Sequence, residues 1–460
     1  MKKSWIYLMI CIPVVTFLMG SCQLGKPYAR PQMELPERLE EHSMDSVSIA
    51  EVPWEELYQD TTLQKLIRRT LENNKDLRIA AARVKELAAM KRIDYANLFP
   101  KLGVNTYGEK EGLNEAGKDF SRSDKFYMKA AVTWELDLWG NLRWAKDKSM
   151  ADFIGSMENQ RALKMSLIAQ MAQSYFELVA LDNELSIVRQ TLEARQEGLH
   201  LAHIRYQGGL TNETPYRQAQ VELAKTATMV PDLEKKVAMK ENEIAFLMGE
   251  YPHDINRTVL PEDVVLPTTL PVGLPSSLLE RRPDVRQAEQ ALIAANASVG
   301  MAFTNLFPRL SLTASAGSES KELENILKSP YSLLSGSLIT PVFNMGKNRA
   351  QLKAKKAAYE QAVLSYEKSV LNAFRDASNA IIEFNKSRAI YESRLHLEQA
   401  SKSSLELAKL QYINGVIGYM DLLDAQRSYF DAQIGLSNSI RDKQITIVHL
   451  YKALGGGWKE

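Results

Sequence analysis

Two stretches of the chain alternate apolar and polar residues with a period of two. Between residues 125 and 139 apolar side chains occupy every second position from Met128 to Leu138, and polar residues such as Lys129 and Glu135 fill many of the positions between them. Residues 310–316 repeat the pattern with leucine and alanine against serine and threonine. Successive side chains of a strand point to opposite faces, so each stretch predicts a strand with one apolar and one polar face. Neighbouring extended segments complete two predicted hairpins, over residues 101–139 and 309–343.

Long segments with helical periodicity follow both hairpins. Residues 141–207 contain no proline, and apolar residues recur there every seven positions, at Met171, Leu178, Leu185, Leu192 and Leu199. This spacing is typical of a coiled-coil seam, and about 65 helical residues would form a rod of roughly 100 Å. Residues 345–413 predict a second rod. Each rod ends near a glycine and is followed by another helical segment, over 215–247 and 419–454.

The chain repeats its own organisation. The sequence NLFPKLGV begins at Asn97, and NLFPRLSL begins at Asn305. Because a hairpin and long helices follow both copies, we interpret the chain as an internal duplication. The first structural repeat covers residues 61–250 and the second covers 281–454. An N-terminal linker or equatorial segment (22–60), an equatorial linker (251–280) and a C-terminal tail (455–460) complete the predicted organisation.

The N-terminus resembles an export signal. Lys2 and Lys3 precede an apolar run over residues 5–19, and small residues then lead to Cys22. The run is short for a helix that spans a bilayer, so we expect residues 1–21 to be a cleaved lipoprotein signal and Cys22 to be acylated. The alternative is an ordinary secretory signal that contains a cysteine. Cys11 lies within the signal, so the mature chain would form no internal disulfide.

Composition narrows the possible partners. A formal net charge of +1 argues against nucleic acid, because binding to phosphate backbones requires a basic excess. No second apolar run approaches membrane-spanning length, so the chain would have to cross a membrane with strands. Four strands cannot close a barrel, and several chains would therefore have to combine their strands.

Candidate catalytic and metal-binding residues do not form a convincing site. His200 and His203 are spaced closely enough to share a metal, but the sequence offers no third ligand. The glycines at 455–457 lack the lysine and the strand–turn–helix context of a phosphate-binding loop. We therefore expect neither an enzyme, nor a cofactor, nor a metal.

Four segments carry a resemblance to a known family. They are GLPSSLLERRPDVRQAEQAL (273–292), WELDLWGN (134–141), YINGVIGYMDLLDAQRS (412–428) and LYKALGGGW (450–458). Together they resemble the TolC and OprM class of outer-membrane efflux factors, and the signal indicates its lipoprotein branch, the NodT-type lipoproteins of resistance-nodulation-division (RND) efflux. The resemblance implies an α+β membrane protein: a trimeric 12-stranded transmembrane β-barrel, with four strands per chain, continued by a long α-helical coiled-coil periplasmic tunnel.

The resemblance also implies location and partners. The chain would be a homotrimer in the cell outer membrane, lipid-anchored, in contact with outer-membrane lipid and extending into the periplasm. A periplasmic adaptor (membrane fusion) protein and an inner-membrane RND pump would complete a tripartite assembly. The protein would be the passive exit channel for small toxic compounds. The alternatives are an outer-membrane channel for type I protein secretion and a lipid-anchored envelope scaffold that does not span the membrane.

The candidate site residues lie at the predicted helix turns. Asp421 and Asp424 are three residues apart, which places both carboxylates on one face of a helix. The resemblance implies a periplasmic gate in which these acids form rings of like charge, with Arg427 as a restraining partner. The alternative is that they are solvated or simply pair with Arg427. Four further residues are the expected hairpin tips and adaptor contacts: Gly209, Leu210, Gly415 and Val416.

Overall fold

A computed structural model describes residues 23–34, 36, 48–114, 116–117, 120–257 and 277–458. The predicted signal peptide (1–21) and the predicted acylation site at Cys22 lie outside the described residues. The chain divides into two compact units. The first contains Met1–Met33, Ala82–Met157 and Gln287–Lys368, and the second contains Glu34–Ala81, Glu158–Arg286 and Ser369–Glu460.

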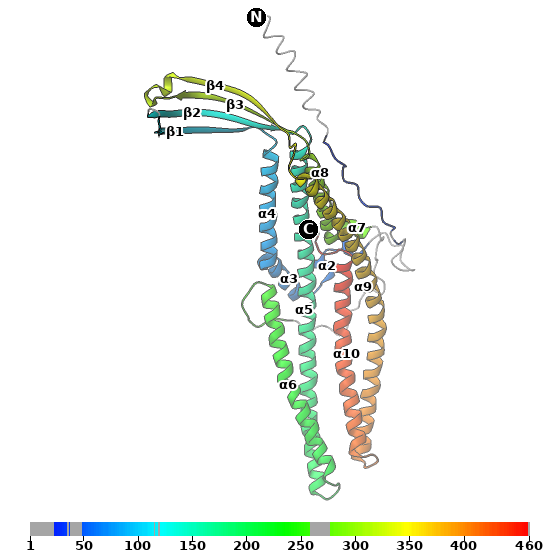
Figure 1. Cartoon of the computed structure of the whole chain (residues 1–460). Helices are drawn as coiled ribbons and strands as arrows, with labels where there is room; N and C mark the ends of the chain where they lie inside the picture. Colours follow the sequence, from blue (N-terminus) through cyan, green and yellow to red (C-terminus); the bar gives the residue numbers. More distant parts are fainter. Residues whose placement is uncertain are drawn as a thin grey trace. The chain divides into compact units, whose positions relative to one another are not determined.

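The first unit carries a four-stranded antiparallel sheet (Figure 1). Its strands are β1 (Lys101–Leu113), β2 (Ser121–Leu136), β3 (Arg309–Ser320) and β4 (Pro330–Ile339), and they lie in the order β1-β2-β3-β4. A short 3-10 helix, η2 (Leu323–Lys328), lies between β3 and β4. Both predicted hairpins are therefore confirmed, and β2 and β3 join them into one sheet. In that sheet β1 and β4 are the edges.

The predicted hairpins extend slightly too far along the chain. β2 ends at Leu136 rather than at residue 139, and β4 ends at Ile339 rather than at 343. The end of β2 has a local cause. The Asp137 carboxylate accepts hydrogen bonds from the backbone N–H groups of Leu142 and Arg143, both at 3.0 Å. Asp137 therefore satisfies two free donors of the next helix, and the backbone leaves the extended conformation to let it do so.

Four helices contribute residues to both units. They are α4 (Lys75–Ala96), α5 (Asn141–Gln207), α8 (Pro283–Thr304) and α9 (Lys347–Ile413). α5 begins and ends at the residues that its lack of proline and its heptads predicted. α8 begins at Pro283, where a missing N–H costs nothing because the first donors of a helix have no intrahelical acceptor.

The second unit is helical. It contains η1 (Ile49–Glu51), α2 (Trp54–Leu57), α3 (Thr61–Asn73), α6 (Thr214–Leu247), α7 (Ser277–Arg281), α10 (Tyr419–Ala453) and parts of the four longer helices. α5 and α6 form one helical hairpin, and α9 and α10 form the other (Figure 1). The predicted heptad seam is confirmed where it is densest: Met171 and Leu178 are fully buried and Leu185 nearly so. Leu192 and Leu199 are only half-buried, and Leu199 packs against a separate, smaller cluster near the hairpin turns.

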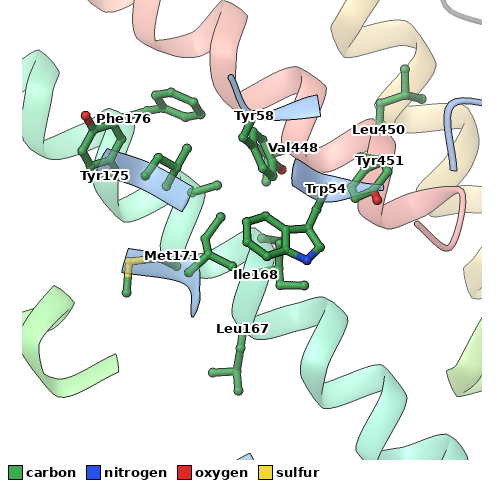
Figure 2. Close-up of a cluster of buried hydrophobic side chains, with 14 of the residues drawn as sticks. Trp54, Tyr58, Leu167, Ile168, Met171, Tyr175, Phe176, Val448, Leu450 and Tyr451 are labelled. Atoms are coloured by element: carbon green, nitrogen blue, oxygen red, sulfur yellow. The ribbon is translucent and has the colours of Figure 1, made fainter. Parts of the chain in front are cut away.

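Part of the predicted N-terminal linker belongs to the hydrophobic core. Trp54 and Tyr58 are 4% and 5% exposed, and Figure 2 shows them among Ile168 and Met171 of α5 and Tyr451 of α10. The hydroxyl of Tyr451 donates a hydrogen bond of 2.7 Å to the carbonyl of Val52. Of the two descriptions predicted for residues 22–60, a linker therefore does not fit residues 49–58, which are a packed segment of the core. A segment this short has too few turns to show helical periodicity, yet its aromatic side chains bury a large apolar area.

Candidate functional site

The two hairpin turns of the second unit have the same backbone structure. Gly209 follows α5 with φ +70°, and Gly415 follows α9 with φ +74°. In each turn the next N–H reaches back five residues: Leu210 donates to the carbonyl of Arg205, and Val416 donates to that of Gln411, both at 2.9 Å. This is the Schellman arrangement, which ends a helix and satisfies its last carbonyls. The glycines supply the left-handed conformation that it requires.

The residue after each glycine is apolar and open to solvent. Leu210 is 73% exposed and Val416 is 70% exposed. A shallow hollow of about 350 Å³ lies beside the first turn and is lined by Glu213, Thr214, Arg217, Gln218 and Val221. The predicted contact residues therefore lie at exposed turns, and the first of these turns adjoins a mixed polar and apolar surface.

Asp421 and Asp424 lie in the first two turns of α10 and have different environments. The Asp421 carboxylate accepts a hydrogen bond of 2.9 Å from the backbone N–H of Gly418, the residue that precedes the helix. The Asp424 side chain is 73% exposed, and its Oδ1 lies 3.7 Å from Nη1 of Arg427. Asp421 therefore caps the helix that presents Asp424, and the expected contact between Asp424 and Arg427 is present but loose.

Arg427 has a closer partner that the sequence did not reveal. Its Nη2 lies 2.6 Å from Oε1 of Glu222 on α6. Glu222 is 4% exposed, and its other carboxylate oxygen lies 2.8 Å from Nη1 of Arg195 on α5. Lys225 adds a third contact at 3.3 Å. One buried carboxylate therefore joins three helices: α5, α6 and α10.

The charge state of Glu222 follows from these contacts. Burial by itself raises the pKa of the carboxyl, but hydrogen bonds from Arg427 and Lys225 and the charge of Arg195 together lower it below its ordinary value. The hydrogen bond to Glu222 is also the main reason that the pKa of Arg427 is raised. Both groups are therefore charged at neutral pH, and the pair is a true ion pair.

A second contact joins the two hairpins close to their turns. The guanidinium of Arg205 on α5 lies 4.6 Å from the ring centroid of Tyr412 on α9, and its Nη1 lies 3.4 Å from the carbonyl oxygen of the same residue. Tyr412 in turn packs edge-on against Tyr419 of α10, with 5.9 Å between the ring centroids. The end of α5 is therefore held against the turn that precedes Asp421.

Local sequence signals were insufficient to identify Glu222 as the buried partner of Arg195 and Arg427. The only nearby cue is Lys225, three residues later on the same helix, and that spacing is typical of an ordinary surface ion pair. The two arginines come from other helices, 27 residues before Glu222 and 205 residues after it. No periodicity within α6 indicates that they would converge there.

The weaker candidates have structural explanations. His203 stacks on Tyr216 with 4.8 Å between the ring centroids. Over the described ranges, no cluster of three or more His, Cys, Asp or Glu residues is arranged to hold a metal ion. Arg282, in the arginine pair before Pro283, is 6% exposed and donates to the carboxylates of Asp284 and Asp376. These contacts hold the start of α8 in place.

The N-terminal segment of the first unit is fixed immediately after the predicted acylation site. Leu24 donates through its N–H to the carbonyl of Trp139 at 3.1 Å and accepts from the indole of Trp144 at 2.8 Å. The amide of Gln23 lies 3.2 Å from the carboxylate of Asp147. Gln23 is therefore held where β2 gives way to α5.

No helix in the described part of the chain combines the length and the apolar character needed to cross a bilayer.

Comparison with known proteins gives matches along almost the whole chain. The family model "Outer membrane efflux protein" matches residues 66–250 and 274–456. The solvent efflux pump outer membrane protein SrpC of Pseudomonas putida is 32% identical over 97% of this chain and 98% of SrpC. "Probable outer membrane lipoprotein SilC" of Salmonella typhimurium is 28% identical over 98% of this chain and 99% of SilC. The solved outer-membrane channel OprN superposes with a TM-score of 0.88 at 28% identity, over 95% of this chain and all of OprN.

Proposed function

The chain belongs to the outer membrane efflux protein family, and from that membership we propose how it works as an efflux channel of the outer membrane. Its fold is the expected one, an antiparallel sheet of four strands per chain with long coiled-coil helices, as in the trimeric channels of this family. Three chains place their sheets edge to edge, β4 of one beside β1 of the next, so that twelve strands close a barrel. The apolar faces contact lipid and the polar faces line the lumen.

The helical hairpins form the periplasmic end of the channel, and a periplasmic adaptor protein binds at their turns. Leu210 and Val416 supply exposed apolar contacts there, on turns fixed by Gly209 and Gly415. An inner-membrane RND pump supplies the energy, and the channel itself is a passive path. As in SrpC, whose name states solvent efflux, the cargo class is small toxic compounds.

Asp421, Asp424 and Arg427 form the gate at this end. In a trimer each acid occurs three times around the axis, and like charges that converge repel one another. The proposal rests on the contact of Arg427 with buried Glu222, which holds α10 against α6 and α5. This contact keeps the acids at a fixed distance from the trimer axis. The gate opens when α10 leaves this contact.

The test is conductance of the purified protein in planar bilayers. We expect discrete steps from the wild-type protein and larger or more frequent steps from Glu222→Gln and from Asp421→Ala/Asp424→Ala. A protein that inserts as a trimer but conducts in none of these forms would contradict the channel proposal. Conductance that is identical in all three forms would contradict the gate alone.

Cys22 anchors the mature N-terminus in the outer membrane. Gln23 and Leu24 are held at the junction of β2 and α5, which is the level at which a barrel strand leaves the membrane. Acyl chains on the preceding residue would therefore enter the periplasmic leaflet without any need for a long tether. Intact-mass measurement of the purified protein tests this: it should begin at Cys22 and carry the added mass of the lipid.

The two halves arose by internal duplication. A helix, two strands, a long helix and a shorter helix occur in this order twice: α4, β1, β2, α5, α6 and then α8, β3, β4, α9, α10. The matching Schellman turns after α5 and α9 support this interpretation. Separate sequence profiles of the two halves in related chains should detect each other.

A further inference from the structure

A band of aromatic and charged side chains crosses the polar face of the sheet. It contains Tyr107 of β1, Tyr127 and Lys129 of β2, Glu319 of β3 and Tyr331 of β4, and we call it the tyrosine belt. The register places these residues side by side, because Tyr127 pairs with both Tyr107 and Glu319, while Lys129 and Tyr331 both pair with Gly317. The belt lies toward the end of the sheet where β3 turns into β4, away from the helices.

The members of the belt contact one another through their rings and charges. The rings of Tyr107 and Tyr127 stack with 5.1 Å between centroids and 20° between planes. The Lys129 ammonium lies 4.5 Å from the centroid of Tyr127 and 3.6 Å from that of Tyr331, and it forms an ion pair with Glu319. One cation is therefore held over two tyrosine faces.

Gly317 makes the contact between Lys129 and Tyr331 possible. It stands between Lys129 and Tyr331 in the register, so no side chain separates them across the intervening strand. A Cβ at this position would come within 2.1 Å of the carbonyl oxygen of Met128. A glycine here therefore permits both the close approach of β2 to β3 and the reach of the lysine to Tyr331.

The centre of the polar face between the belt and the helices carries mostly small side chains, with Leu333 of β4 as the large exception. Its central positions include Ala131, Thr133, Ser315, Thr313 and Ser335. None of the described strand residues on this face outside the belt is aromatic. The belt is thus the place on this face where a solute meets π surfaces.

We propose that the tyrosine belt is a contact site for aromatic organic cations as they leave the barrel. This rests on the proposed function, in which the polar face lines the lumen and three copies form a ring. Tyrosine faces attract cations through the ring quadrupole, and Lys129 already occupies two of them. Tyr107 is 44% exposed, which leaves part of its surface open for stacking. A solute with both a positive charge and a ring would replace the ammonium and stack at the same time.

The test is block of single-channel current in planar bilayers by benzyltrimethylammonium, added from the side of the strand loops. We expect concentration-dependent interruptions in the wild-type protein and in Glu222→Gln, and much weaker effects of tetramethylammonium and benzyl alcohol. Tyr127→Leu/Tyr331→Leu should weaken block about tenfold, which is the loss expected for one or two cation–π contacts. Tyr127→Phe keeps the ring and should keep the block. The matched control is Thr133→Val on the same face of β2, which should also keep it.

A second variant changes the block in the opposite direction. Lys129→Met/Glu319→Gln removes the Lys129 charge from the ring faces without leaving a bare carboxylate, so benzyltrimethylammonium should block more strongly than in the wild-type protein. If the belt only holds the sheet together, this variant would lower thermal stability and leave block unchanged. Equal block by tetramethylammonium, or unchanged block in Tyr127→Leu/Tyr331→Leu, would overturn the proposal while conductance persists. Absence of conductance in every form would instead contradict the proposed function.

Discussion

Glu222 of α6 and Arg427 of α10 form an ion pair in which Nη2 lies 2.6 Å from Oε1. The Glu222 side chain is 5% exposed, whereas that of Arg427 is 42% exposed. Arg427 can therefore move from the pair into solvent, whereas Glu222 would remain buried beside Arg195. The asymmetry suits a contact that must break and re-form, because only the arginine has to move.

Glu222→Gln should loosen the helical end of the channel and destabilise it moderately. The amide fills the same volume but leaves the buried Arg195 without its counter-charge. Breaking a fully buried pair costs about 3–5 kcal/mol, and the remaining hydrogen bonds should reduce the loss to about 1–3 kcal/mol. Thermal unfolding in detergent and bilayer conductance measure the two effects.

A surface pair supplies the matched control for that variant. Glu213 contacts Arg217 one turn later on α6, and their side chains are 48% and 64% exposed. Exposed pairs contribute about 0–1 kcal/mol. Glu213→Gln should therefore change neither stability nor conductance. If it behaved like Glu222→Gln, the effect would come from charge at the helical end in general and not from the buried pair.

Acid should weaken this contact only below the ordinary pKa of a glutamate. The Glu222 carboxyl has its pKa lowered in the folded protein from 4.5, so the pair contributes full stability above pH 4.5 and loses it as the pH falls through the lowered value. Two groups around it do not titrate in this range: burial raises the pKa of Tyr419, and the hydrogen bond to Glu222 raises the pKa of Arg427. Conductance recorded from pH 7 to 3 should rise below about pH 4.5, in part because Glu222 becomes protonated. Glu222→Gln should lack that part of the rise.

Substitutions should show that Asp421 has a structural role as well as a charge, and that Asp424 has an electrostatic role alone. Asp424→Asn removes an exposed charge that has only a loose contact, so it should raise conductance and leave thermal stability within about 0.5 kcal/mol. Asp421→Ala also removes the acceptor for the Gly418 N–H and should cost about 0.5–2 kcal/mol. Equal stability of the two variants would show that the capping contact contributes nothing.

The glycine turns have room for a side chain, but their backbone conformation disfavours any residue other than glycine. A Cβ on Gly415 would meet no atom within 4 Å, yet its φ is +74°. Gly415→Ala should therefore cost about 1–2 kcal/mol through the left-handed conformation alone. Gly198, inside α5, also has open space, and Gly198→Ala should stabilise by about 0.5–1 kcal/mol. A stabilising effect of Gly415→Ala in thermal unfolding would contradict this account.

Sequence patterns identified the features that depend on neighbours along the chain. The alternation around Lys129 predicted β2, and the heptads through Met171 and Leu178 predicted α5 to its last residue. The glycines after both rods predicted the turns. These features follow from periods of two and seven residues and from glycine's freedom of conformation, all of which act over a few residues.

Only the tertiary structure decided which distant side chains meet. Glu222 receives Arg195 and Arg427 because the rotation and register of three helices bring one position of each together. Lys129 reaches Tyr331 because strand pairing sets Gly317 between them. Trp54 and Tyr58 are in the core because α5 and α10 leave space that large rings fill. Such contacts depend on how whole elements pack, and no local period in the chain encodes the choice of partner.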